Sequence, residues 1–336
     1  MRVGAGDARR SPPVLLIAIT MFRFSRFSRC CLVLHGARVA LLLVFSGLFL
    51  SRSSAQEGTY DWSKSKAFYP GILYTHVEST SPQKTVINCM RVDLQTPGIR
   101  FDTTRRCLNW MEGKEETRRR TVRDFVRQSQ RTDKKIVVAI NGDGFSPWPA
   151  PYQKETLTDV GGLLVSNGTI VSRGRGTPSF IVTKSGEVRI EKTSPDADLT
   201  DIETAVSGFG LCLIDGHVPA SNRDLAPRTG LGLSADRRYV IMMTIDGRQP
   251  ASAGASTQSV GEWLEHFGAH RGINMDGGGS TTMVWWDPKA PERDKCRLLN
   301  SPVGNGVTYD PQKAKASFHP TERANGSNLG VYFSKK

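Results

Sequence analysis

The sequence predicts an α+β fold in which a large mixed, mainly antiparallel sheet packs with a few helices. Short apolar segments of strand length recur along the chain, and several pairs are joined by Asn-Gly or Ser-Gly turns. Two longer segments repeat apolar residues at the spacing of an amphipathic helix. Three strands end in clusters of polar residues and glycine, so polar-glycine loops are expected to converge at strand ends.

Residues 1–55 have the pattern of a secretory signal peptide. An apolar run at 39–50 is followed by the small residues 53–55, which suit a cleavage site. The run is short for a membrane span; an uncleaved anchor is the alternative, and Met21 is an alternative start. Four arginines precede the run: Arg23, Arg26, Arg29 and Arg38. After cleavage the protein is expected to be secreted or to stay in the periplasm or cell envelope, without an integral membrane span.

The rest of the chain is interpreted as an irregular lead-in at 56–84 and one domain at 85–336. The full chain has 336 residues and a formal net charge of +13. Residues 1–55 contribute eight Arg and one Asp, so removing their +7 leaves +6. This mild excess does not indicate a nucleic-acid partner. The densest basic stretch, at 118–127, is expected to be a solvated helix face, with an acidic glycan or envelope surface as the alternative partner.

Apolar runs and turn residues locate the strands. Strands are predicted at 86–93, 99–103, 136–140, 239–245 and 272–276. The first two are expected to flank a turn at Thr96-Pro97-Gly98 as a hairpin. Two further hairpins are predicted at 163–171 around Asn167-Gly168 and at 180–190 around Ser185-Gly186.

Two helices are expected between these strands. Thr121 is the predicted N-cap of the first, whose apolar residues Val122, Phe125 and Val126 fall on one face. The second is predicted to open with the capping box Ser259-x-x-Glu262 and to end at Gly268. Its inward residues are expected to be Val260, Trp263, Leu264 and Phe267.

Four cysteines follow the signal peptide: Cys89, Cys107, Cys212 and Cys296. An even number outside the cytoplasm predicts disulfides. Cys89 and Cys107 flank the predicted hairpin, so they are expected to pair, and Cys212 would pair with Cys296 by elimination. No cysteine or histidine has metal-ligand spacing, so no metal site and no cofactor are expected. A Ca²⁺ site among clustered carboxylates is the alternative, although the several closely spaced Asp that such sites favour are absent.

The most informative segment is 274–282, which reads N-M-D-G-G-G-S-T-T. An apolar strand enters it and another, Met283–Trp286, leaves it. Three consecutive glycines cost backbone entropy and are tolerated where the chain turns sharply or approaches a ligand. Their N–H groups can form a cradle for an anion. Neither a P-loop lysine nor the G-x-G-x-x-G spacing of a dinucleotide site is present, and a plain glycine-rich turn is the alternative.

Three predicted strands end in a polar-glycine cluster: Asn141-Gly142-Asp143, Asp246-Gly247-Arg248 and Asn274-Met275-Asp276-Gly277. If the strands lie in one sheet and end at the same edge, carboxylate, amide and guanidinium groups converge there. Arg228, in the segment 226–230, would add a second guanidinium. Together with the glycine triplet, the clusters predict a site for a polar and anionic ligand.

These segments resemble the phosphodiester glycosidase family. The resemblance rests on A-P-R-T-G-L-G at 226–232, I-D-G-R-Q at 245–249 and N-M-D-G-G-G-S-T-T at 274–282, with the helix between the last two. It covers roughly residues 85–335 and includes the closing segment R-A-N-G-S-N at 323–328. The A-I-N-G-D-G-F segment at 139–145 also fits, although Gly144 stands where the family usually has an aromatic residue.

The resemblance implies hydrolysis of a sugar 1-phosphodiester, with an N-acetylglucosamine-type sugar as one candidate, to free sugar and a phosphomonoester. Asp276 is expected to be the essential carboxylate, as nucleophile or base, with Asp246 or Asp143 as its partner. Guanidinium groups suit bidentate phosphate contact. The residues expected to bind the phosphate or the sugar are Asn141, Arg228, Thr229, Arg248, Asn274, Gly277, Gly278, Gly279, Ser280 and Thr281.

Each of these assignments has a structural alternative. Arg248 would otherwise pair with Asp246 or Asp276, and Asn274 would otherwise cap the end of its strand. Ser280 and Thr281 would otherwise be ordinary strand hydroxyls. A non-catalytic protein that binds an envelope polysaccharide in the same cleft is the alternative to an enzyme. In both cases the expected partner is a phosphodiester-linked carbohydrate or a cell-envelope glycan.

Overall fold

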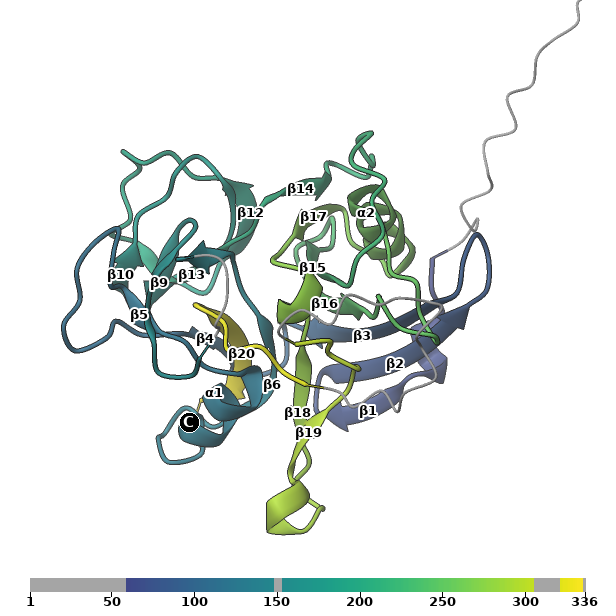
Figure 1. Ribbon diagram of the computed structural model, residues 1–336, viewed down its shortest axis with the longest axis horizontal. Helices are drawn as coiled ribbons and strands as arrows, with labels where there is room; N and C mark the ends of the chain where they lie inside the picture. Colours follow the sequence, from purple (N-terminus) through teal and green to yellow (C-terminus); the bar gives the residue numbers. More distant parts are fainter. Residues whose placement is uncertain (1–58, 148–152, 305–320, 335–336) are drawn as a thin grey trace, which may run out of the picture. The chain divides into compact units, whose positions relative to one another are not determined.

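A computed structural model describes residues 59–147, 153–304 and 321–334 (Figure 1). The predicted signal peptide lies outside these residues. The described part contains twenty β-strands, two α-helices and three short 3₁₀ helices, at Trp62–Lys64, Gly278–Ser280 and Glu292–Asp294. Neither α-helix in this part is long and apolar enough to cross a membrane.

The largest sheet has seven strands, and every neighbouring pair is antiparallel. In spatial order its strands are β1 (Lys66–Tyr69), β2 (Ile72–Ser79), β3 (Thr85–Asp93), β16 (Tyr239–Ile245), β15 (Arg228–Leu233), β17 (Arg271–Asn274) and β14 (Gly210–Leu213). Because β1 and β2 extend this sheet, the prediction of an irregular lead-in at 56–84 is wrong for residues 66–79.

Two five-stranded sheets and one three-stranded sheet complete the fold. The first has the order β19 (Cys296–Leu298), β18 (Met283–Trp286), β6 (Ile136–Asn141), β20 (Asn328–Phe333), β4 (Ile99–Thr103). The second has the order β10 (Thr169–Ser172), β9 (Leu164–Ser166), β13 (Ile202–Ser207), β11 (Pro178–Thr183), β12 (Val188–Lys192). The small sheet has the order β5 (Thr117–Arg118), β8 (Leu157–Val160), β7 (Phe145–Ser146).

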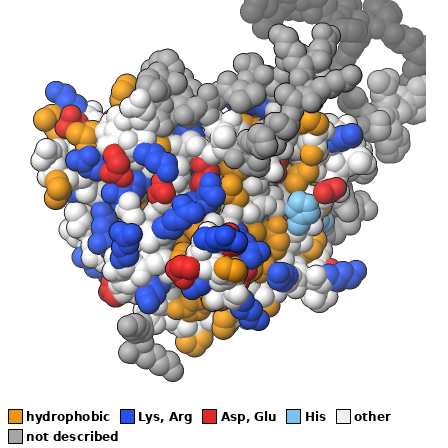
Figure 2. Space-filling view, turned by 60° about the horizontal axis from the view of Figure 1, so that its bottom comes forward, with side chains coloured by type: hydrophobic (Ala, Val, Ile, Leu, Met, Phe, Trp, Pro, Cys, Tyr) orange, Lys and Arg blue, Asp and Glu red, His pale blue; other side chains and the backbone are white. Residues whose placement is uncertain are grey.

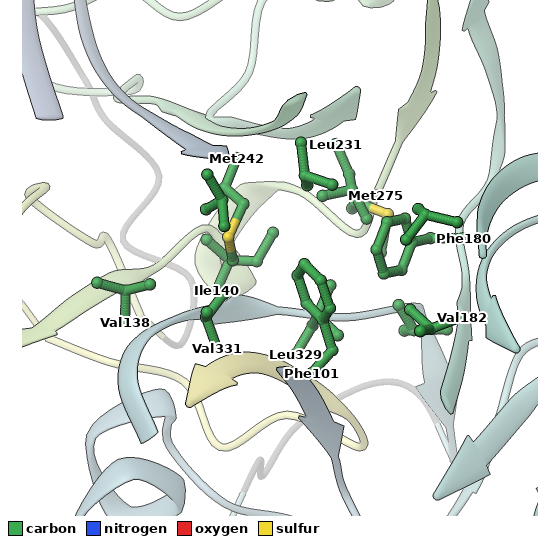
Figure 3. Close-up of a cluster of buried hydrophobic side chains, with 14 of the residues drawn as sticks. Phe101, Val138, Ile140, Phe180, Val182, Leu231, Met242, Met275, Leu329 and Val331 are labelled. Atoms are coloured by element: carbon green, nitrogen blue, oxygen red, sulfur yellow. The ribbon is translucent and has the colours of Figure 1, made fainter. Parts of the chain in front are cut away.

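The prediction of a sheet-rich, mainly antiparallel fold with few helices is confirmed, but the single large sheet is replaced by three. The main apolar core lies where the three large sheets face one another. Figure 3 shows Met242 and Leu231 of the seven-stranded sheet above Ile140 and Leu329, with Phe180 of the third sheet beside them. Burying such a side chain contributes about 1.5–3 kcal/mol, so the sheets stabilise one another through this core.

The two helices form as the sequence predicts, with one change of cap. Thr121 caps α1 (Val122–Ser129), because its hydroxyl accepts the N–H of Asp124 at 3.1 Å. The cap of α2 (Thr257–His266) is Ser256, whose hydroxyl accepts the N–H of Ser259 at 3.0 Å. The predicted capping box at Ser259 is therefore wrong by three residues. The helix ends at His266, and Gly268 follows its C-cap Phe267 with a φ of +94° that favours glycine, so the predicted stop signal is confirmed.

Two of the three predicted hairpins are confirmed, as β9–β10 and β11–β12. The hairpin of 86–93 with 99–103 is wrong, although both strands exist. Strand β3 pairs with β2 and β16, whereas β4 turns away to pair with β20 near the end of the chain. The turn residues 96–98 therefore connect two different sheets. A partner so distant in sequence leaves no local signal.

The predicted disulfides are also wrong, because the four described cysteines are free and buried. The hairpin that was to bring Cys89 and Cys107 together does not form. Cys212 lies in β14 and Cys296 in β19, which belong to different sheets. The Cys107 thiol contacts the carbonyl of Glu115 at 3.1 Å instead. The expectation of an oxidising compartment therefore rests on the predicted signal peptide alone.

We expect all four of these thiols to react once the protein is unfolded without reductant. In the folded protein they should react slowly, because they are buried and because burial raises the pKa of Cys212 and Cys296 to about 12. Alkylation followed by peptide mapping, with and without denaturant, checks both statements. Recovery of a peptide pair joined through Cys89 and Cys107 would contradict the structure.

Candidate functional site

The three polar-glycine clusters meet, although they do not end one sheet as predicted. Strands β16 and β17 are both antiparallel to β15, so they end at the same edge of the seven-stranded sheet. Strand β6 belongs to another sheet. Asn141 at its end joins the two sheets, because its amide donates to the Asp276 carbonyl at 2.8 Å. The Asp276 N–H in turn donates to the Gly142 carbonyl at 3.1 Å.

Asn141 and Thr229 position these loops rather than face a ligand. The Thr229 hydroxyl donates to Asn141 Oδ1 at 2.7 Å, and the same oxygen accepts the Thr282 N–H at 3.1 Å. Both side chains are fully buried. Their hydrogen-bonding groups are used within the protein, so we assign them the role of fixing Asp276 at the junction of the two sheets.

Asp276 lies in an open pocket of about 360 Å³. Its Oδ1 accepts the Gly277 N–H at 2.9 Å. Burial raises the pKa of Asp276, while the Ser280 hydroxyl, the Arg323 guanidinium and the Gly277 N–H act in the opposite direction. The residues lining the pocket are Gly144, Phe145, Ser146, Asp159, Gly161, Arg175, Phe209 and Asp276.

Asp143 is buried directly behind this pocket, under Gly144 and Gly161. Its Oδ1 accepts the Gly144 N–H at 2.7 Å, and its Oδ2 has no hydrogen-bond partner among the described residues. Its pKa is raised to about 7, mainly by burial and also by the Asp276 carboxylate, although the Gly144 N–H and Arg175 act in the opposite direction. The raised pKa keeps Asp143 protonated below about pH 7.

Asp246 lies away from the pocket that Asp276 lines. Its Oδ1 accepts the Asn300 amide and the Ser301 N–H, each at 3.0 Å. Asn300 also donates to the Thr281 carbonyl at 3.1 Å. Asp246 is buried and does not line the pocket, and burial raises its pKa to about 6. We therefore assign it the anchoring of the segment around Asn300 against the loop that follows the glycines.

The glycine triplet serves close packing more than anion binding. The Gly277 N–H donates to Asp276 and the Gly278 N–H donates to the Pro227 carbonyl at 2.8 Å, so these two amides are not available for the predicted cradle. Gly278 has a φ of +61°. A Cβ on Gly279 would lie 1.8 Å from the Gly304 carbonyl oxygen and 2.5 Å from Arg323. The backbone can approach these groups only without side chains.

Two guanidinium groups flank the glycines on the side of the seven-stranded sheet. Arg228 donates through Nε to the Ala255 carbonyl at 3.0 Å, and burial and the charge of Arg248 lower its pKa. Arg248 is exposed, and a Cβ on Gly278 would lie 3.3 Å from its Nη1. No ion pair joins Arg248 to Asp246 or Asp276 within the described chain. The alternative of a simple ion pair is therefore not supported, and the positive charge of Arg248 faces outward.

The other predicted ligands lie around Asp276. The Ser280 hydroxyl accepts from Arg323 at 3.4 Å and also lowers the pKa of Asp276. Asn274 Oδ1 and the Thr281 hydroxyl are buried and have no hydrogen-bond partner among the described residues. Asn274 is therefore not a side-chain cap of its strand. Unpaired buried polar atoms beside a carboxylate are candidate ligand contacts.

Four residues of the site were missed from the sequence. Arg175 lines the pocket and donates from Nη2 to both oxygens of Asp159, at 3.1 and 3.0 Å. Phe209 is 57% exposed at the pocket rim, and its ring fills the space beside Gly144. Arg323 lies near Asp276 and Gly279. Phe209 carried a signal as an aromatic residue between two glycines, and Arg323 opens the family segment at 323–328.

The arrangement suits a ligand that is both polar and anionic. Asp276, Asp159 and the Arg175 guanidinium line an open pocket, and the carboxyl group of Asp143 is buried behind it. The described residues contain no group of three or more His, Cys, Asp or Glu placed to hold a metal ion. The fold and the site thus define a sheet-rich protein with a carboxylate-based site at its strand ends.

Comparison with known proteins identifies the family. A model of the phosphodiester glycosidase family matches residues 134–331, which include Asp143, Asp159, Asp246 and Asp276. The chain belongs to the phosphodiester glycosidase family. A search of curated proteins finds no match.

Two solved structures have a similar fold. The catalytic domain of zebrafish N-acetylglucosamine-1-phosphodiester α-N-acetylglucosaminidase, auto-inhibited by its pro-peptide, aligns with a TM-score of 0.53 at 17% identity, covering 80% of this chain and 87% of that one. A hypothetical protein from Synechocystis aligns with a TM-score of 0.51 at 13% identity, covering 80% of this chain and 63% of that one. At these identities the likeness concerns the fold alone.

Proposed function

We propose that this protein hydrolyses a sugar 1-phosphodiester, releasing the sugar and a phosphomonoester. The observation that carries the proposal is the position of Asp276, which lines an open pocket with the buried Asp143 behind it. Guanidinium groups lie on two sides, from Arg175 within the pocket and from Arg248 beyond Gly278. Membership of the phosphodiester glycosidase family supports the same reaction.

The two carboxylates have environments that separate their roles. Asp143 has an unpaired Oδ2 and a pKa of about 7, so it is protonated below that pH. Burial raises the pKa of Asp276, while the Ser280 hydroxyl, Arg323 and the Gly277 N–H lower it. We therefore take Asp276, which lines the pocket, as the carboxylate that reaches the substrate, and Asp143, which does not line it, as a positioning residue.

Hydrolysis breaks the bond between the anomeric carbon and the phosphate oxygen, and a water oxygen takes the place of that phosphate oxygen. The phosphomonoester leaves with the electron pair and is a weak base, so it needs little protonation. One carboxylate at the anomeric carbon, acting as nucleophile or as base for the water, then suffices if the phosphate charge is stabilised. We assign the first task to Asp276 and the second to Arg175 and Arg248.

The exposed ring of Phe209 at the pocket rim offers an apolar surface on which a sugar ring can pack. Together with the family, this favours a hexose of the N-acetylglucosamine type. The predicted signal peptide supports action outside the cytoplasm, on a secreted or envelope glycan. Asn274 and Thr281 are proposed to contact the sugar hydroxyls through their unpaired polar atoms.

Turnover of a chromogenic N-acetylglucosamine 1-phosphodiester tests the proposal directly. We expect release of the free sugar together with the chromogenic phosphomonoester, detected after phosphatase treatment. The alternative is a non-catalytic polysaccharide-binding protein. Saturable binding of the same compound with no product after prolonged incubation would support that alternative and reject the enzyme.

We expect Arg248→Lys to lower kcat/KM by at least about ten-fold, because lysine keeps the charge but loses the planar fork that binds two phosphate oxygens. Arg228→Lys should also lower it, since Nε and Nη2 of Arg228 hold the Ala255 and Asp224 carbonyls. Steady-state kinetics on the chromogenic phosphodiester measure both effects. Arg237→Lys is the matched control, in an exposed turn outside the pocket. Unchanged kinetics for Arg248→Lys would assign the phosphate to Arg175.

A further inference from the structure

A second pocket, of about 450 Å³, lies where the end of β4, strand β5 and helix α1 meet. Six of its lining residues have charged side chains: Asp102, Arg105, Arg106, Arg118, Arg120 and Glu155. We call it the basic pocket. Figure 2 shows Lys and Arg side chains spread over the left and centre of the face that it views, with fewer Asp and Glu among them. The proposed function gives this pocket no role.

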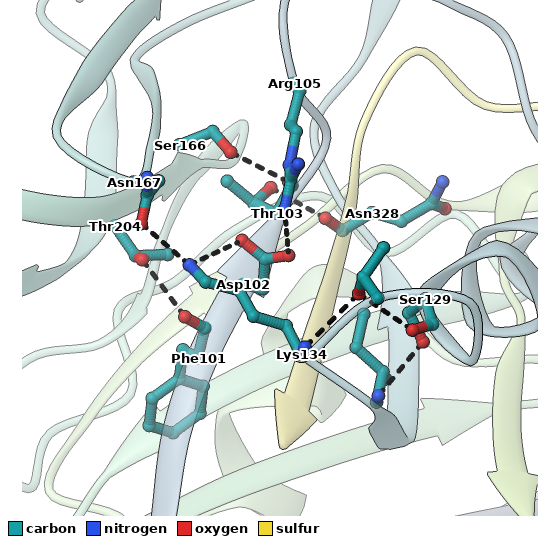
Figure 4. A network of polar contacts seen from close by, with 12 residues as sticks. Phe101, Asp102, Thr103, Arg105, Ser129, Lys134, Ser166, Asn167, Thr204 and Asn328 are labelled. Atoms are coloured by element: carbon teal, nitrogen blue, oxygen red, sulfur yellow. Dashed lines mark hydrogen bonds and ion pairs between the residues drawn. The ribbon is translucent and has the colours of Figure 1, made fainter. Parts of the chain in front are cut away.

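The two acidic residues of the basic pocket are already neutralised. Asp102 is buried at its floor, where Lys134 Nζ lies 3.5 Å and Arg105 Nη2 lies 3.9 Å from the carboxylate (Figure 4). Lys134 is held there by a 2.8 Å hydrogen bond to Asn167 Oδ1. Glu155 pairs with Arg120 at 3.3 Å. The remaining charge of the pocket is therefore positive.

Arg106 and Arg118 carry that remaining charge. Neither forms an ion pair with a carboxylate in the described part of the chain. Arg106 donates through Nε to the Ile170 carbonyl, and its guanidinium stacks 3.6 Å from the centre of the Trp110 ring. Arg118 donates through Nη1 to the Glu155 carbonyl at 3.2 Å. Contacts with neutral groups thus orient both guanidinium groups and leave their charge for an external anion.

The basic pocket and the pocket of Asp276 meet on one face of the small sheet. Arg118 pairs with Leu157 in β8, and Asp159 lies two residues further along the same strand. Leu157 and Asp159 therefore lie on the same face of the sheet as Arg118. Arg118 and Asp159 are diagonal neighbours across the two strands, and such neighbours are about 7–8 Å apart. Ser146 pairs with Asp159 and also lies on this face. The opposite face carries Thr117 and Thr158, which are fully buried.

This face therefore connects the two sites. Asp159 holds Arg175 in the first pocket, and Arg118 belongs to the second. A linear polymer with a phosphodiester in every repeat can lie across the face, with one phosphate near Arg175 and another near Arg118. A single sugar phosphodiester can fill only the first of these positions.

We propose that the basic pocket is a second anion subsite that binds a phosphodiester of the same chain, one or more repeats from the bond at Asp276. The substrate class is then a polymeric, phosphodiester-linked glycan. This inference rests on the proposed function, because it assigns the reacting bond to the pocket of Asp276.

The test compares substrates of increasing length. Initial rates are measured on a chromogenic N-acetylglucosamine 1-phosphodiester and on defined oligomers that contain up to four phosphodiester repeats. For the wild type we expect kcat/KM to rise by at least about ten-fold from monomer to tetramer. In the Arg106→Gln/Arg118→Gln variant this rise should shrink to less than about two-fold, while the rate on the monomer stays within about two-fold of the wild type. High salt should also reduce the rise.

The matched control is Arg237→Gln/Arg293→Gln, which removes two exposed arginines that line neither pocket. It should keep the full dependence on length. Equal length dependence in the two double variants, or none in the wild type, would overturn the inference. The inference would also fall if Arg106→Gln/Arg118→Gln lost affinity for anionic lipid vesicles and kept the preference for oligomers, since that result assigns the pocket to a membrane surface.

A binding measurement separates failure of this inference from failure of the proposed function. Calorimetric titration of the tetramer into Asp276→Asn protein, with and without the Arg106 and Arg118 substitutions, reports the subsite without turnover. If the wild type hydrolyses no phosphodiester and the arginine substitutions weaken tetramer binding, the enzyme is rejected and the anion subsite is kept. Hydrolysis of the monomer with unchanged tetramer binding would reject only the subsite.

Discussion

Asp276→Asn is expected to lower hydrolysis of a sugar 1-phosphodiester by at least about a hundred-fold, the scale on which acid–base and nucleophilic groups contribute. The substitution keeps the shape of the side chain and removes its charge. Asparagine can still accept the Gly277 N–H through its amide oxygen. The protein should therefore stay folded, with a thermal midpoint close to that of the wild type. Melting curves and initial rates on the same preparation measure both outcomes.

Asp246→Asn is the control for Asp276→Asn. It tests whether removing any buried carboxylate near the site lowers turnover. Asp246 accepts hydrogen bonds from Asn300 and the Ser301 N–H, away from the pocket. Its replacement should lower stability more than turnover. A folded Asp276→Asn protein with near-normal turnover, together with an inactive but folded Asp246→Asn protein, would reverse the assignment of the two carboxylates.

The second large effect is on the pH dependence of stability, through Asp143. Its pKa is about 7 in the folded protein and 3.8 in an unperturbed aspartate, so the folded state holds the proton more tightly. The free energy of unfolding should therefore fall as the pH rises from about 4 to about 7, by up to about 4 kcal/mol from this group. Asp143→Asn cannot titrate, so its stability should fall less over the same interval. Denaturant titrations at several pH values compare the two slopes.

Subtracting the two pH profiles isolates Asp143, because Asp246 and Asp276 also have raised pKa values and act in the same direction in both proteins. Activity gives an independent check. Above about pH 7 Asp143 loses its proton and places a second negative charge beside Asp276, so wild-type turnover should decline. Asp143→Asn should keep its activity to higher pH. Parallel stability profiles for the two proteins would show that Asp143 is already ionised in the folded state.

Local patterns in the sequence determined the elements of this fold. Strand β16, the two tight hairpins and the cap of α1 are set by residues within a few positions of one another, so they are readable without a structure. The segment 274–282 likewise indicated a ligand site and the family, because its unusual composition is contiguous in the chain.

The tertiary structure decided everything that depends on distant partners. Strand β4 pairs with β20 rather than with β3. The hairpin that would bring Cys89 and Cys107 together is therefore absent, and both cysteines are free. The same holds for the carboxylates: Asp246 and Asp143 both follow an apolar strand and precede a glycine, but only Asp143 is buried against the pocket of Asp276. Arg175 enters the site from a segment with no distinguishing pattern. Burial and electrostatic coupling arise from packing between remote segments, and the order of residues along the chain does not specify them.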